Sequence, residues 1–153
     1  MSIDKSILEI EKLLPFLEIG NHKVSKAGIA WHIDHSLKVI NSVCDDLKKV
    51  KSTKIKPTHS FIKSYVFLTG NIPRGKGKAP KKVVSNNNIS KEMIKEQLIL
   101  AKNNLTDVKK LPIKNYFSHP YFGMLSLKKS LRFLEIHTNH HLKIVNDILK
   151  SNG

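Results

Sequence analysis

The sequence predicts an all-α fold, an antiparallel four-helix bundle with one long basic loop, in which residues 1–153 form a single domain. Two observations predict it: long segments whose apolar residues recur with a helical period, and the lack of a clear strand pattern. At 153 residues with 40% apolar content, the chain can bury about two-thirds of its unfolded surface in one core.

The N-terminal part is expected to form two helices. The first runs from about residue 2 to residue 14, with Pro15 near its end. The second runs from Lys26 to Val50, because Ser25 is a suitable N-cap and the segment beyond it has a helical period. The expected apolar stripes are Ile3, Ile7, Ile10, Leu13 and Leu14 in the first helix, and Ile29, Ile33, Leu37, Ile40, Val43, Cys44 and Leu47 in the second.

The rest of the chain is expected to be helical on both sides of an irregular stretch. A shorter helix is expected over 58–68, and the glycine- and lysine-rich residues 70–82 form the basic loop, which continues through 86–88. Ser90 is expected to cap a third long helix and Ser126 the last one. In the third long helix, the side chains expected to face inward are Met93, Ile94, Leu98 and Ala101.

Two histidines, His137 and His141, lie four residues apart in the last helical segment. Side chains at this spacing lie one above the other on a helix, so both imidazoles can reach one metal ion. At about 100° per residue, they share a face with the apolar residues of the segment, whereas the charged residues fall elsewhere. We therefore expect both rings in the core, where each needs a ligand or a hydrogen-bond partner. The other residues of this face are Ser130, Phe133, Leu134, Ile144 and Ile148.

The second helix contributes two further histidines. His32 lies at the flank of the apolar stripe, about 60 to 80° from its middle, whereas His35 lies about 120° or more away among polar residues. His32 is therefore the better candidate for the interior, and His35 is expected to be exposed or to support His32. Trp31 points away from the centre of the stripe and is expected to pack against another helix or to line a cavity mouth.

Other catalytic arrangements find little support. Thr138 follows the first histidine of the pair, so the His-Glu-x-x-His metalloprotease motif with its built-in base is absent. Cys44 falls on an apolar stripe and is expected to be a small core residue. Asp34 points off that stripe and is not assigned a proton-transfer role. His119, just before Pro120, is expected in the loop that enters the last helix, where it could overhang a site.

Three segments together resemble a known family. They are Trp-His-Ile-Asp-His-Ser-Leu at 31–37, His-Pro-Tyr-Phe-Gly at 119–123 and His-Thr-Asn-His-His at 137–141. They resemble the DinB superfamily of metal-binding four-helix bundles, and within it an uncharacterised branch with a His-Pro-Phe/Tyr-Phe-Gly segment before a last helix that carries a His-x-x-x-His pair. The resemblance covers residues 25–40 and 119–145.

The resemblance implies a metal site and a reaction class. In that superfamily one histidine of the second helix and two of the last bind a divalent metal, and the matching residues here are His32, His137 and His141, with His35 as the alternate. Three imidazoles leave a coordination position for water or substrate, and zinc, nickel and iron all accept them. Characterised members include bacillithiol transferases and maleylpyruvate isomerases. The resemblance thus implies a metal-dependent enzyme that acts on a small electrophile, with a low-molecular-weight thiol as a candidate cofactor, and it is compatible with a homodimer.

The net charge of +15 leaves alternatives open. It is compatible with a non-enzymatic bundle that binds nucleic acid or another polyanion, or with a protein that binds a metal or ligand without turnover. Only Arg74 and Arg132 are arginines among the 27 cations, and lysines occur along every expected helix, so we favour solvated helix faces over a nucleic-acid partner. Residues 70–76 match part of a phosphate-binding loop, but Gly77 replaces its Ser or Thr and Pro80 interferes with the helix that should follow.

Composition also suggests a compartment. One cysteine excludes an internal disulfide, which suits a reducing cytoplasm. No run approaches the roughly 20 apolar residues that cross a bilayer, and the first residues lack the apolar stretch of a signal peptide. We expect a cytoplasmic protein with no membrane partner.

Overall fold

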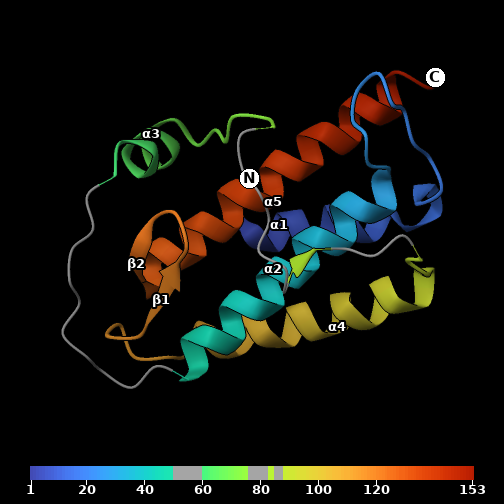
Figure 1. Cartoon of the computed structure of the whole chain (residues 1–153). Coiled ribbons are helices and arrows are strands. Elements are labelled where there is room, and N and C mark those ends of the chain that lie inside the picture. Colours follow the sequence, from blue (N-terminus) through green and yellow to red (C-terminus); the bar gives the residue numbers. More distant parts are fainter. Residues whose placement is uncertain (50–59, 76–82, 85–87) are drawn as a thin grey trace.

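The computed structural model describes residues 1–49, 60–75, 83–84 and 88–153, and it is mostly helical, as the sequence predicts (Figure 1). The helices α3 and α5 and the hairpin between β1 and β2 lie on one side of α2 in this view, and α4 lies on the other. The elements are α1 (Ile3–Lys12), the 3₁₀ turn η1 (Leu14–Phe16), α2 (Ile29–Lys49), α3 (Phe61–Thr69), α4 (Lys91–Val108), β1 (Tyr116–His119), β2 (Gly123–Ser126) and α5 (Leu127–Lys150).

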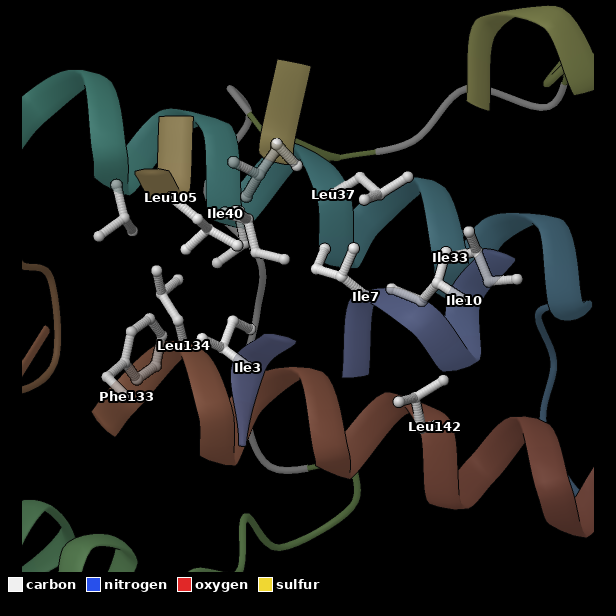
Figure 2. Close-up of a cluster of buried hydrophobic side chains, with 14 of the residues drawn as sticks. Ile3, Ile7, Ile10, Ile33, Leu37, Ile40, Leu105, Phe133, Leu134 and Leu142 are labelled. Atoms are coloured by element: carbon white, nitrogen blue, oxygen red, sulfur yellow. The ribbon is translucent and has the colours of Figure 1, made fainter. Parts of the chain in front are cut away.

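Helix α2 is the centre of the packing. It lies along both α4 and α5, and α1 packs against α5 and touches α4. Figure 2 shows Ile33, Leu37 and Ile40 of α2 meeting side chains of α1 and α5. Every residue of the stripe expected in the second helix is buried, as are all the apolar residues expected on the inward face of the last helix. Helical periodicity therefore identified the core correctly in both helices.

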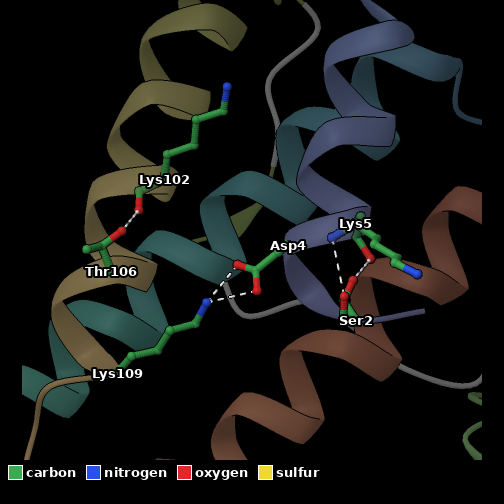
Figure 3. A network of polar contacts seen from close by, with 7 residues as sticks. Ser2, Asp4, Lys5, Lys102, Thr106 and Lys109 are labelled. Carbon is green, nitrogen blue, oxygen red and sulfur yellow. Dashed lines mark hydrogen bonds and ion pairs between the residues drawn. The ribbon is translucent and has the colours of Figure 1, made fainter.

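Serine side chains begin three of the helices. The hydroxyls of Ser2, Ser90 and Ser126 accept hydrogen bonds from the backbone N–H three residues later, which satisfies donors that have no partner within the helix. The caps expected at Ser90 and Ser126 are thereby confirmed. Figure 3 shows the Ser2 cap beside the ion pair between Lys109 Nζ of α4 and Asp4 Oδ1 of α1, at 2.7 Å.

The second helix begins later than expected. Its first residue is Ile29, so Ser25 is not its N-cap. Ser25 Oγ instead accepts a hydrogen bond from the N–H of Ala27 at 3.2 Å and lies 3.0 Å from His32 Nε2. A serine that closes a tight turn ahead of a helix has the same local sequence signal as a cap, which explains the error.

The sequence also did not predict the hairpin that β1 and β2 form. The strands pair in antiparallel fashion from Tyr116 with Ser126 to His119 with Gly123, and Gly123 has a φ of 64° that favours glycine. His119 therefore ends a strand, and the segment before α5 is not a plain loop. Strands of four residues are too short to show a clear alternation of polar and apolar residues.

The remaining expectations are met in part. Helix α3 covers most of the expected 58–68 helix, whose first two residues lie outside the described part of the chain, and Gly70 ends it with a φ of 65°. Residues 70–75 of the expected basic loop form no helix or strand, whereas 76–82 are not among the described residues. In α4, Met93 is 42% exposed, contrary to the prediction, because the buried stripe of that helix passes through Ile94, Leu98 and Ala101. Among the described residues, no helix combines the length and apolarity that crossing a membrane requires.

Truncating the centre of the core should cost far more stability than truncating the surface. Leu37 is 0% exposed and Leu68 is 88% exposed. We expect Leu37→Ala to lower the free energy of unfolding by about 2–5 kcal/mol, because it removes buried methyl groups and leaves a cavity. The matched Leu68→Ala change should stay within about 0.5 kcal/mol of the wild type. Urea unfolding measures both, and equal effects would contradict the central place of α2.

Candidate metal centre

Three histidines from α2 and α5 converge on one point. One ring nitrogen from each of His35, His137 and His141 lies within 4.8 Å of the other two. The rings also contact one another directly, with centroids 5.1 Å apart for His35 and His137 and 4.7 Å apart for His137 and His141. We call these three residues the histidine triad, and they lie close enough together to bind a metal ion.

His35 is held in a defined orientation. Its Nδ1 lies 2.8 Å from the carbonyl oxygen of Val83, and because a carbonyl can only accept, this nitrogen must carry the hydrogen. The lone pair of the ring is therefore on Nε2. Trp31 stacks on the same ring, with centroids 5.0 Å apart and planes 16° from parallel. A carbonyl on one nitrogen and a lone pair on the other is the usual arrangement of a metal-binding histidine.

The burial of His35 corrects the sequence prediction. The sequence predicts that His35 is exposed or supports His32, but its side chain is only 4% accessible and it belongs to the histidine triad itself. Periodicity places it opposite the main apolar stripe of α2, yet Trp31 and the buried Val83 cover that side of the helix. A residue 48 positions away in the chain supplies the cover, so no local pattern could reveal it.

His32 is buried as predicted, but the structure does not group it with His35 and His137. Its Nδ1 lies 2.9 Å from Nδ1 of His141, and its Nε2 lies 3.0 Å from Ser25 Oγ. These contacts connect His32 to one ring of the histidine triad through Nδ1 of His141, and within the described part of the chain Nε2 of His141 has no hydrogen-bond partner. Two of the three residues expected as ligands thus belong to the triad, the alternate His35 is the third member, and His32 lies behind His141.

Burial keeps these imidazoles neutral. It lowers the pKa of His32 to about 4 and that of His137 well below the ordinary histidine value, and it also lowers the pKa of His35 and His141. The neutral ring is the form that binds a metal, so at pH 7 the donors are ready without loss of a proton. His137 Nδ1 is moreover buried without a hydrogen-bond partner among the described residues. An unpartnered buried nitrogen is costly unless something else satisfies it.

The histidine triad borders a cavity of about 1030 Å³. Trp31 and His119 both line it, as the sequence analysis suggested for a pocket. His140, half-buried beside His141, also lines it and was not singled out from the sequence; its place three residues after His137 was the available signal. Most other walls are apolar and come from α2, α3, the hairpin and α5. They include Val39, Val43, Ile62, Val66, Phe117, Phe122, Phe133 and Ile144.

Two other groups lie outside the cavity walls. Asp34 is fully buried, forms an ion pair with Lys38 at 2.7 Å and accepts a hydrogen bond from Gln97 of α4. Its carboxylate therefore stabilises the packing of α2 on α4. Cys44 is fully buried, which raises the pKa of its thiol to about 12, so the prediction of a core residue is confirmed.

Comparison with known proteins finds no match: no protein-family model, no curated protein and no solved structure matches this chain. Its function is therefore inferred from the residues and their geometry.

Single substitutions should separate the metal ligands from the residue behind them. We expect His35→Ala and His137→Ala to abolish stoichiometric metal binding. We expect His32→Ala to keep the stoichiometry but to weaken the affinity about 10–100-fold, because it removes a hydrogen-bond partner of a ligand. Elemental analysis and competition with a chelator measure the two quantities. The exposed His22, changed to Ala, is the control, and loss of stoichiometry with His32→Ala but not with His35→Ala would reverse the assignment.

Stability of the metal-free protein should fall on acidification. The pKa of His32 is about 4 in the folded chain and 6.5 without perturbation, so below pH 6.5 the unfolded chain binds a proton that the folded chain does not. The free energy of unfolding is therefore expected to be level above pH 6.5 and to fall between pH 6.5 and 4, by up to about 1.4 kcal/mol per pH unit for each such group. Urea unfolding across this range tests the slope. His32→Gln should reduce the slope by the contribution of one such group, and His22→Gln should leave it unchanged.

Proposed function

We propose that this chain is a DinB-like four-helix bundle, built from α1, α2, α4 and α5, that holds one divalent metal ion through His35, His137 and His141. The packing supports the bundle, because α2 contacts α4 and α5 while α1 contacts the same two helices. The single observation that carries the metal is the convergence of the three ring nitrogens beside a cavity.

The residues fit a metal ion for three reasons. All three donors are neutral imidazoles, which suit zinc, nickel or iron. Nε2 of His35 has its lone pair free because Nδ1 donates to Val83. The buried Nδ1 of His137 has no hydrogen-bond partner among the described residues, and a cation near this ring would offset that cost.

The proposed activity is a metal-dependent transfer of a low-molecular-weight thiol to a small electrophilic substrate, or a related reaction. A divalent ion with three protein ligands supplies an open position, lowers the pKa of a bound thiol or water and polarises the substrate. The surrounding residues do the rest: apolar side chains hold the body of the substrate and exclude water, while Val83 and Trp31 hold His35 in place. A site that only stabilised the fold would not need a cavity of about 1030 Å³ next to its ligands.

Thiol transfer is expected to depend on the triad. Protein loaded with zinc, nickel or iron is incubated with monochlorobimane and with glutathione, bacillithiol or cysteine, and conjugate fluorescence is followed. We expect at least one metal and thiol to give a rate about tenfold or more above that of His137→Ala, because loss of the metal removes the activated thiolate. The Leu68→Ala variant is the control. Equal rates for the wild type and His137→Ala would contradict the enzymatic proposal and leave a metal- or ligand-binding protein without turnover.

A second candidate, polyanion binding, is favoured by one observation. From Leu47 to Lys91 the sequence has twelve Lys and Arg residues and no Asp or Glu, so this stretch supplies most of the net charge of +15. Within its described part, however, Lys48 pairs with Asp107 and Arg74 pairs with Asp147, at 3.1 and 2.6 Å. Acidic residues from α4 and α5 thus neutralise part of the charge, and the metal centre remains the stronger proposal.

Salt dependence separates the two candidates. A polyanion-binding protein releases counterions, so its affinity for a labelled oligonucleotide falls steeply with salt concentration. We expect weak binding at low salt that vanishes near physiological salt, measured by fluorescence anisotropy. Tight binding that persists at physiological salt and is unchanged by His35→Ala would favour the polyanion candidate.

A further inference from the structure

His119 is fixed by the backbone of its own turn. Its Nδ1 accepts hydrogen bonds from the N–H groups of Tyr121 and Phe122, both at 3.1 Å. A nitrogen that accepts two such bonds cannot itself carry a hydrogen. In the neutral ring the hydrogen is therefore on Nε2, and the hairpin selects a single tautomer.

The ring plane of His119 is fixed as well. Phe122 stacks on one face, with centroids 4.3 Å apart and planes 11° from parallel. The Phe133 ring of α5 meets it nearly edge-on, with centroids 4.6 Å apart. Burial, and secondarily the charge of Lys63, lowers the pKa of His119 to about 4, which keeps the ring neutral near pH 7. Both the direction and the protonation of Nε2 are thus set before any ligand arrives.

Nε2 of His119 has no hydrogen-bond partner among the described residues. The residue lines the cavity that the histidine triad borders. A single ring, that of Phe133, lies between them: it contacts His119 on one side and His137 on the other, with centroids 5.5 Å apart for the latter pair. His119 and the histidine triad therefore border the same cavity and have the Phe133 ring as a shared neighbour.

We propose that His119 Nε2–H donates a hydrogen bond to an oxygen of the molecule that occupies the cavity beside the metal centre. This proposal rests on the proposed function and specifies its ligand: an apolar molecule with an oxygen acceptor, such as a carbonyl or carboxylate, next to the group that meets the metal. A fixed donor accepts nothing in return, so it selects against ligands that present only an N–H donor at that place. The cavity walls include Ile62 and Val66 together with Phe117, Phe122 and Phe133, which contact His119, and they suit an apolar or aromatic body.

Two substitutions separate the role of His119 Nδ1, which accepts from the backbone of the turn, from the role of Nε2–H as a donor. In His119→Asn, the side-chain oxygen takes the place of Nδ1 and can still accept from Tyr121 and Phe122, but the donor at Nε2 is lost. In His119→Gln, the terminal amide can supply a donor near the position of Nε2, but the acceptor at Nδ1 is lost. The exposed His22, changed to Asn, is the matched control.

The test uses cobalt(II)-loaded protein and two probes. Benzohydroxamate has an aromatic body and oxygen acceptors at its metal-binding end, whereas thiophenol has a similar body and binds through sulfur alone. Cobalt content is measured first for every variant, and each probe is then titrated by its effect on the cobalt absorption spectrum. We expect His119→Asn to keep the cobalt content and the thiophenol affinity but to bind benzohydroxamate about tenfold more weakly. His119→Gln, if folded, should recover part of that loss.

The outcomes distinguish the two proposals. A wild-type protein that takes up no cobalt would overturn the metal centre and, with it, this role for His119. Normal cobalt uptake with equal benzohydroxamate affinity in the wild type and His119→Asn would overturn the donor role alone, as would equal loss of affinity for both probes, which would indicate a general packing effect. Nitrogen NMR of the histidines in the metal-free protein adds an independent check, since a protonated Nδ1 of His119 near pH 7 would also overturn it.

Discussion

The packing of α2 against α5 depends on how the chain satisfies its buried imidazole rings. Leu37, Ile40 and Leu134 make an ordinary apolar core, but the same interface also holds polar rings that lose their contact with water. His35 bonds to a carbonyl and His32 bonds to Ser25 and lies against His141, while a nitrogen of His137 is left without a partner. An apolar residue at these places would be simpler to bury. Such a costly cluster in an otherwise apolar core is what the proposed metal centre would explain.

The histidines show which parts of the site the sequence could predict. In α5 the periodic pattern was enough to bring both histidines to the core, where His141 is buried and His137 is partly buried. In α2 the pattern favoured His32 over His35, because periodicity finds the widest apolar stripe and α2 is buried on more than one side. The cover over His35 comes from Val83, far away along the chain. Such a contact is a property of the tertiary fold and leaves no trace in the local spacing of residues.

The fold was predictable to a similar extent. Caps and apolar stripes located the long helices, since both signals are local. The hairpin was missed because its strands are short, and the start of α2 was misplaced because a serine in a tight turn resembles a cap. The orientation of His119 follows from two backbone N–H groups of that hairpin, so it too became visible only once the turn was known.

The direct junction between the hairpin and α5 has a mechanical consequence. Strand β2 ends at Ser126 and α5 begins at Leu127, with no linker between them. His119, His137 and His141 therefore lie on directly connected elements, while His35 belongs to α2 and bonds to Val83, in the segment that precedes α4. A small sliding of α2 along α5 would change the distances from His35 to the other two histidines but leave His119 in place relative to them. In the proposed metal centre, an ion bound by all three histidines would therefore connect α2 to α5 and fix the position of one helix relative to the other.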